Sequence, residues 1–221
     1  MSNPDPGQAA PELILTVNLW SMTGHPDPEN EWPIEQKLEF LKASGADAFS
    51  DNAERNPAYP GLCRESGLRF AGAFDVAAEK DMRGLIEKQI AVDSGPVNCQ
   101  LADHDTPVGE AIRLTIALME EAERQDAEVH LEVHRDTCTE TPEKAYAIID
   151  GYQKATGKTP RINFDFSHPA IIKHLWPEEY SERLLVRPEV LQQATLLHIR
   201  PFNGHHCQVP ITDGNGALSR E

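Results

Sequence analysis

The sequence has few of the features that mark several large classes of protein. Its 221 residues include only 20 Lys and Arg against 36 Asp and Glu, which gives a formal net charge of −16. Because an acidic surface repels phosphate groups, this composition argues against a nucleic-acid partner and against binding to anionic membranes. No apolar run approaches the roughly 20 residues that cross a bilayer. The chain also lacks the glycine-rich GxGxxG and GxxxxGK[ST] patterns, so no motif supports a dehydrogenase or a kinase.

Cysteine is scarce as well. The four residues Cys63, Cys99, Cys138 and Cys207 are far apart, and no two form a CxxC pair. Such spacing is typical of free thiols in a reducing compartment, so we expect a cytoplasmic protein. Residues 1–12 lack the basic start and apolar centre of a signal peptide, and we expect them to form a flexible leader.

What the sequence does contain is a regular alternation of strand-like and helix-like segments. The predicted strands are Leu13–Leu19, Asp47–Phe49, Leu68–Phe74, Pro96–Leu101, Val129–Val133, Ile162–Phe166 and Leu196–Ile199. The predicted helices are Pro33–Ala43, Tyr59–Glu65, Ala78–Ala91, a segment starting at Thr106-Pro107 and reaching Arg124, a segment from Thr141-Pro142 to Gly157, and Pro188–Ala194. The two Thr-Pro pairs predict an N-cap followed by proline at the first helical position.

This alternation predicts an α/β protein with a parallel sheet and helices outside it. About seven β/α units without a phosphate-binding fingerprint favour a (β/α)8 TIM-type barrel over a doubly wound sheet. Residues after 200 look like loop, so the eighth strand is missing from this chain. We therefore expect residues 13–221 to form one incomplete barrel domain, truncated at its C-terminal end.

Unusual polar residues gather where the predicted strands end, which is where barrels place their active sites. In RINFDFSH, Asp165 interrupts an otherwise apolar strand, and a buried carboxylate needs a partner. Glu132, Asp165 and His198 come from three consecutive strands, and carboxylate with imidazole suits Mn²⁺, Co²⁺, Mg²⁺ or Zn²⁺. Two alternatives stay open: Asp165 could form an ion pair with Arg200 or Arg135, and His198 could be an ordinary core histidine.

These residues resemble those of the xylose isomerase-like TIM barrels, a superfamily of sugar-phosphate isomerases and epimerases that also includes endonuclease IV. The resemblance rests on Glu132 in LEVHRD, on the spacing of Asp165 and His168 in DFSH, on His198-x-Arg200, and on the loop HHCQVPITDGNG. It implies that Glu132, Asp165 and His198 are three of four metal ligands, the fourth being a glutamate of the eighth strand that this chain lacks.

The resemblance also implies a function and a set of substrate contacts. The reaction would be isomerisation or epimerisation of a sugar or polyol next to its carbonyl, through an enediolate-type intermediate, with Glu132 as a base. Gln100, His168, Arg200 and His206 would contact the substrate. The alternatives are an inactive barrel that binds a metal or a sugar, and an endonuclease IV-like phosphodiesterase, which the charge of −16 disfavours. An unclosed barrel edge would favour a homo-oligomer.

Overall fold

The structure is a computed structural model that describes residues 12–212 and 215–218. Its strands are β1 (Thr16–Asn18), β2 (Ala48–Asn52), β3 (Arg69–Val76), β4 (Val97–Leu101), β5 (Val129–Val133), β6 (Ile162–Phe164) and β7 (Leu196–Leu197). Its α-helices are α1 (Ile34–Ala43), α2 (Tyr59–Ser66), α3 (Glu79–Ala91), α4 (Val108–Arg124), α5 (Pro142–Thr156), α6 (Ser167–Ile172), α7 (Tyr180–Arg183) and α8 (Pro188–Leu191). Three short 3₁₀ helices are η1 (Leu19–Met22), η2 (Ala53–Arg55) and η3 (Pro177–Glu179).

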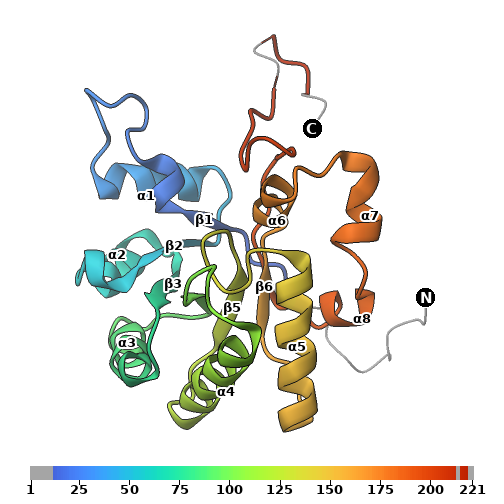
Figure 1. Ribbon diagram of the computed structural model, residues 1–221. Coiled ribbons are helices and arrows are strands. Elements are labelled where there is room, and N and C mark those ends of the chain that lie inside the picture. The colour runs from blue at the N-terminus through green and yellow to red at the C-terminus, as the bar shows by residue number, and fades with distance from the viewer. Residues whose placement is uncertain (1–11, 213–214, 219–221) are drawn as a thin grey trace, which may run out of the picture.

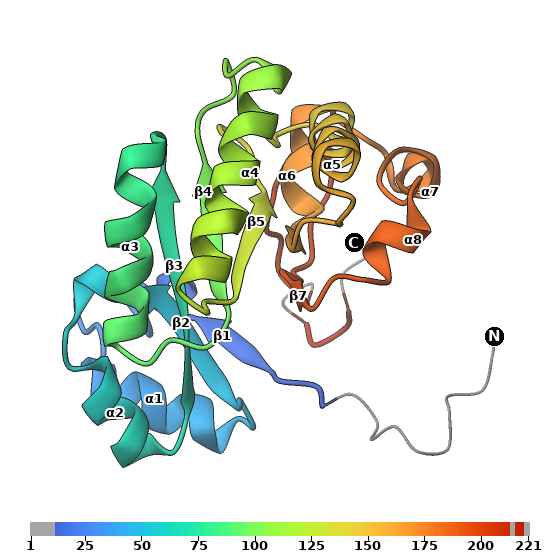
Figure 2. The ribbon, with the colours of Figure 1, turned by 90° about the horizontal axis from the view of Figure 1, so that it is seen from below.

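All seven strands belong to one parallel sheet whose spatial order follows the chain from β1 to β7. The sheet curls, and α1 to α5 lie in an arc around its outside, as Figures 1 and 2 show. Within the described residues, β1 pairs only with β2 and β7 pairs only with β6, so the curl does not close. The predicted incomplete (β/α) barrel is therefore confirmed.

The two faces of the central strands differ in polarity. In β5, Val129, Leu131 and Val133 pack against apolar side chains of the surrounding helices. Successive strand residues point to opposite faces, so His130 and Glu132, which lie between them, face the other side of the sheet. Both are polar, and both are buried as well. The same alternation runs through β4 and β6, so the inner face of the curl carries polar groups and the outer face carries the core.

The predicted elements agree with the structure in order, and most of the helix bounds agree closely. The predicted first and seventh strands are too long, because β1 covers only Thr16–Asn18 and β7 only Leu196–Leu197, and the predicted second strand is too short, because β2 runs to Asn52. The Thr141 hydroxyl caps α5 by accepting a hydrogen bond from the backbone N–H of Lys144, as predicted. The N-cap predicted at Thr106 is wrong, because the N-cap residue of α4 is Pro107, which has no capping side chain, and the Thr106 hydroxyl donates to Asp103. The predicted sixth strand is too long, since β6 ends at Phe164 and α6 starts at Ser167.

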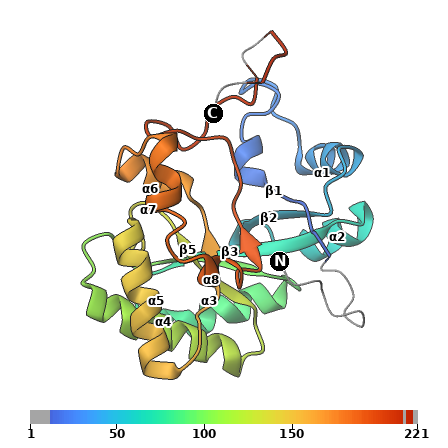
Figure 3. The ribbon, with the colours of Figure 1, turned by 90° about the vertical axis from the view of Figure 1, so that its right-hand side faces the viewer.

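The C-terminal part of the chain takes an irregular path past α6, which Figure 3 shows from the side. Helices α6 and α7, which the sequence pattern did not predict, precede β7 in this region. The predicted leader at residues 1–12 lies outside the described residues except for residue 12. Among the described helices, none combines the length and the apolar character that crossing a bilayer requires.

Candidate metal centre

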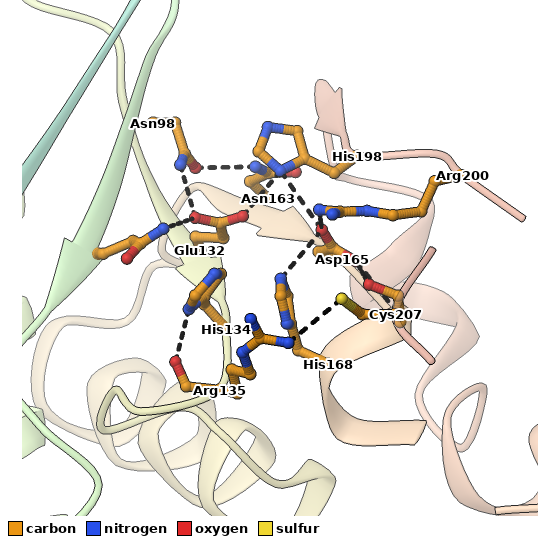
Figure 4. Close-up of polar contacts among 12 residues, drawn as sticks. Asn98, Glu132, His134, Arg135, Asn163, Asp165, His168, His198, Arg200 and Cys207 are labelled. Carbon is orange, nitrogen blue, oxygen red and sulfur yellow. Dashed lines mark hydrogen bonds and ion pairs between the residues drawn. The ribbon is translucent and has the colours of Figure 1, made fainter. Parts of the chain in front are cut away.

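Glu132 lies at the centre of a buried polar network on the inner face of the sheet (Figure 4). Its side chain is 2% exposed, and its Oε2 accepts hydrogen bonds from Asn98 Nδ2 at 2.6 Å and from Gln100 Nε2 at 3.0 Å. Asn163 Nδ2 in turn donates to Asn98 Oδ1 at 2.8 Å. Three neighbouring strands, β4, β5 and β6, therefore fix the orientation of one carboxylate, which compensates the cost of its burial.

His198 follows β7 and faces two carboxylates. Its Nδ1 lies 2.7 Å from Glu132 Oε1 and 3.6 Å from Asp165 Oδ2. Burial alone would lower the pKa of His198, but hydrogen bonds to Asp165 and Glu132 raise it to about 9. Burial opposes ionisation of Glu132 too, yet His198 holds the pKa of that carboxyl below its ordinary value. The protonated, positively charged imidazole of His198 thus stabilises the two carboxylates.

Asp165 directly follows β6 and is fully buried. Its oxygens accept hydrogen bonds from the Ser167 backbone N–H at 3.1 Å, from the Ser167 hydroxyl and from the Arg200 guanidinium. Burial would raise the pKa of Asp165, but His198, His168 and Arg200 hold it well below its ordinary range. Of the two ion pairs left open by the sequence, the one with Arg200 forms, whereas Arg135 donates to Cys207 Sγ at 3.2 Å.

The donor atoms fit a divalent cation. One ligand atom each from Glu132, Asp165 and His198 lies within 4.8 Å of the other two. A set of two buried carboxylates and one half-buried imidazole, at the carboxyl ends of adjacent strands, suits Mn²⁺, Co²⁺, Mg²⁺ or Zn²⁺. Asn98 and Gln100 occupy one oxygen of Glu132 and leave the other directed at His198 and Asp165, as the hydrogen-bond partners that orient metal ligands do.

The other predicted site residues fall at different distances from this centre. Gln100 donates to Glu132, Arg200 pairs with Asp165, and His168 lies 3.4 Å from Asp165 through its Nε2. His206 does not join them within the described residues: it sits in an exposed loop, where its backbone N–H donates to Asn203 Oδ1 at 2.9 Å.

Sequence reasoning missed three polar residues of the inner face. Asn98 and Asn163 belong to the hydrogen-bond network around Glu132, and Asp75 in β3 is paired in register with Gln100. Asp75 is exposed at its edge of the sheet, and partial desolvation raises its pKa. The sequence spacing could have identified the two asparagines, because side chains two residues apart in a strand point to the same face. Asn98 lies two residues from Gln100, and Asn163 lies two residues from Asp165.

Comparison with solved structures shows that several known barrels have a similar fold. A D-allulose 3-epimerase from Methylomonas sp. matches with a TM-score of 0.60 at 12% identity, covering 85% of this chain and 72% of the epimerase. A xylose isomerase-like TIM barrel protein from Mycobacterium smegmatis, in complex with magnesium, matches with a TM-score of 0.56 at 16% identity, covering 84% of this chain and 74% of that one. This chain therefore has the fold of a TIM barrel that is incomplete over the described residues, similar to the barrels of these proteins.

A third neighbour in fold is the IolI protein, whose structure holds a zinc atom. It matches with a TM-score of 0.56 at 14% identity, covering 87% of this chain and 76% of IolI. No protein-family model and no curated protein matches the sequence. At these low identities the comparisons establish the fold, and the function has to be argued from the site.

Proposed function

We propose that this xylose isomerase-like barrel is a metal-dependent sugar isomerase or epimerase. The observation that carries the proposal is the convergence of Glu132, Asp165 and His198, from or just beyond three adjacent strands, on one point at the carboxyl end of the sheet. Neighbours in fold include an epimerase in complex with D-allulose and proteins that hold magnesium or zinc, which supports both the reaction class and the metal.

Glu132, Asp165 and His198 would hold the ion. When bound, a divalent cation supplies a Lewis acid that polarises a carbonyl and the hydroxyl beside it. Asn98 and Gln100 fix the Glu132 carboxylate in one orientation and keep it ionised. Glu132 would then accept the proton from the carbon next to the carbonyl, giving an enediolate-type intermediate.

The remaining groups would bind the substrate. Arg200, with a side chain 23% exposed, reaches from the surface to Asp165 and can donate further N–H groups to sugar oxygens. His168 is buried, and burial lowers its pKa to about 4, so its neutral ring can donate one hydrogen bond and accept another. A polyol or ketose, with vicinal oxygens and no charge, matches such a mixed set of donors and acceptors.

Proton exchange provides a test that does not require the product to be known. Ketoses are incubated with the chain and Mn²⁺ or Co²⁺ in D₂O, and deuterium incorporation next to the carbonyl is followed by NMR. We expect incorporation with at least one ketose, and a loss of about 100-fold or more in Glu132→Gln. Sugar or metal binding without exchange would favour the non-catalytic barrel instead, and cleavage of abasic DNA would favour the phosphodiesterase.

Two further proposals concern the molecular setting. All four cysteines are free thiols, which supports a reducing, cytoplasmic environment. The open edges of the sheet lie beside exposed apolar side chains, which supports association of copies; these are Leu13, Leu15, Leu197 and Ile199. Sedimentation at increasing concentration tests the association, since a single monomeric species throughout would contradict it.

A further inference from the structure

The segment that follows β5 folds back and joins the ends of β4 and β5. The register pairs between these two strands stop at Cys99 and Leu131, before either strand ends. Beyond that point the two strands are bridged by residues 137–139, which we call the threonine wedge. On the β4 side, the backbone N–H of Cys138 donates to the carbonyl oxygen of Leu101 at 3.1 Å. The wedge therefore acts as a neighbour of β4 where β5 no longer does.

On the β5 side, the wedge bonds through two hydroxyl groups. Thr139 Oγ1 accepts from the His134 backbone N–H at 3.2 Å and donates to the Glu132 carbonyl oxygen at 2.6 Å. Thr137 Oγ1 accepts from the Thr139 backbone N–H at 3.3 Å and donates to the His134 carbonyl oxygen at 2.7 Å. A hydroxyl has one hydrogen to donate, so both groups are committed to the backbone around Glu132.

These bonds lie away from solvent. Thr137 is 4% exposed and Thr139 is 1% exposed. The chain reaches this position through Asp136, whose φ of 61° lies in the left-handed region that a short polar side chain tolerates. Without the hydroxyls, buried backbone groups would have no partner, which is more unfavourable than the loss of the bond alone. Valine at either position would keep the shape of the side chain and remove its hydrogen bonds.

The backbone held in this way carries the Glu132 side chain. Its Oε2 accepts from Asn98 Nδ2 and Gln100 Nε2 of β4, at 2.6 Å and 3.0 Å. A site residue has to be held to within about 0.5 Å of its working position, which requires a fixed backbone as well as fixed partners. The amides of β4 orient the carboxylate, and the wedge holds the β5 backbone in place relative to β4.

We propose that Thr137 and Thr139 are positioning residues for Glu132. The threonine wedge sets the separation between the ends of β4 and β5, and through it the direction of the Glu132 carboxylate. Removal of groups that orient metal ligands typically changes metal affinity or activity by about 10–100-fold. The inference rests on the proposed function for the role of Glu132 as ligand and base, whereas the positioning itself is a property of the chain without metal.

Side-chain amide signals in NMR spectra test the positioning without metal. The NH₂ groups of Asn98 and Gln100 report on their hydrogen bonds to Glu132. We expect these signals to shift in Thr139→Val and in Thr137→Val, and to return to their wild-type positions in Thr139→Ser, which keeps the hydroxyl. Unchanged Asn98 and Gln100 signals in both valine variants would overturn the proposal.

A matched control removes an equally buried hydroxyl elsewhere. Thr115 in α4 is 0% exposed, and its hydroxyl donates to the Ala111 carbonyl oxygen at 2.8 Å. Thr115→Val and Thr139→Val should lower the urea midpoint of unfolding by similar amounts, but only Thr139→Val should shift the two amide signals. The same shifts in both variants would show a general loosening of the fold and would also overturn the proposal.

Metal affinity connects the wedge to the proposed function. In calorimetry with Mn²⁺, we expect the Kd to rise about 10–100-fold in Thr139→Val, to stay unchanged in Thr115→Val and to recover in Thr139→Ser. A wild-type Kd in Thr139→Val would overturn the role of the wedge at the site. A wild-type chain that binds no Mn²⁺ would contradict the metal site of the proposed function, while the amide signals would still decide whether the wedge positions Glu132.

Discussion

Asn98 shows how a neutral side chain can support an acidic centre. It donates to Glu132 and accepts from Asn163, so its removal leaves both buried groups short of a partner. We expect Asn98→Ala to lower the free energy of unfolding by about 1–3 kcal/mol in urea titrations. Gln192→Ala, an exposed amide on α8's C-terminal side, serves as control and should change it by less than about 0.5 kcal/mol. Equal effects of the two substitutions would contradict the role of the network.

The cysteines divide into two pairs by burial. Cys99 and Cys138 are at most 1% exposed; burial raises the pKa of Cys138 to about 12 and that of Cys99 well above its ordinary value. Because the thiolate is the reactive form, we expect these two to resist a disulfide reagent in the native chain while Cys63 and Cys207 react. Four fast-reacting thiols before denaturant is added would show that this packing is wrong.

At the residue scale, the sequence predicted those site residues whose side chains are of an unusual type for their position in a strand. Glu132, Asp165 and His198 stood out because charged or imidazole groups are rare in buried strand ends. Asn98 and Asn163 did not, since an amide inside a strand looks ordinary until its partner across the sheet is known. The His134 and His168 rings have centroids 3.8 Å apart. Their contact depends on the turn into α6, which the strand predicted through Phe166 hid.

At the scale of elements, Glu143 at the start of α5 joins that helix to the region of α6 and α7. It lies 3.1 Å from Lys173 Nζ and 2.8 Å from Arg183. Burial would raise its pKa, but a backbone N–H and these two cations lower it to about 2. The stabilisation is therefore complete above the unfolded-state pKa of about 4.3 and is lost as pH falls towards 2.

Replacing the Glu143 carboxylate should remove its pH-dependent contribution to the free energy of unfolding. We expect Glu143→Gln to lower the free energy of unfolding by less than about 1 kcal/mol at pH 7, because the pairs are half-exposed and screened. The difference from wild type should shrink between pH 4.5 and pH 3. Glu120→Gln on α4, an exposed position, is the control. A difference that grows on acidification would contradict a lowered pKa of Glu143 in the folded chain.

Gly204 fixes the path of the C-terminal segment against the residues after α6. A Cβ at this position would lie 2.5 Å from the backbone carbonyl oxygen of Leu175, so only glycine fits without a shift of the backbone. We expect Gly204→Ala to lower the melting temperature, with a cost of about 1–3 kcal/mol. Gly109→Ala in α4 meets no atom within 4 Å and should stabilise the chain by about 0.5–1 kcal/mol. No loss of stability in Gly204→Ala would mean that this contact is not formed.

Elements with complete sequence signals were predicted well. The bounds of β5 agree with the prediction, and α5 begins with a threonine cap and ends before Gly157 in a left-handed conformation. The Thr106-Pro107 pair predicted an N-cap one residue too early, because the Thr106 hydroxyl donates to Asp103 in the preceding turn. Helices α6 and α7 have six and four residues, too few for an apolar repeat to show.

For the whole molecule, alternation of strands and helices was sufficient to predict the curled parallel sheet, because crossover connections allow few arrangements. The polar inner face was harder to predict. Barrel interiors are usually filled by branched apolar residues, whereas here amides and carboxylates bond to one another across β4, β5 and β6. Register between strands decides which of these groups meet, and register is not visible in a single strand.

Metal binding should stabilise the entire fold. The site draws on β5, β6 and the residues after β7, which are far apart in the unfolded chain. At a free concentration 100 times the Kd, a cation that binds only the native state adds about 2.7 kcal/mol. For a chain of this size we expect the melting temperature to rise by about 5–10 °C with Mn²⁺ or Co²⁺ and to return on addition of a chelator. An unchanged melting temperature at saturating metal would contradict a site of this kind.

The central claim is that Asp165 is held ionised in the barrel in order to bind a metal. We would measure Mn²⁺ and Co²⁺ binding by calorimetry to the wild-type chain, to Asp165→Asn, and to Asp81→Asn as an exposed control with the same change of charge. Binding to wild type and Asp81→Asn that is lost in Asp165→Asn is the predicted result. Equal binding by all three, or none by any, would contradict the claim and leave Asp165 as the ion-pair partner of Arg200 alone.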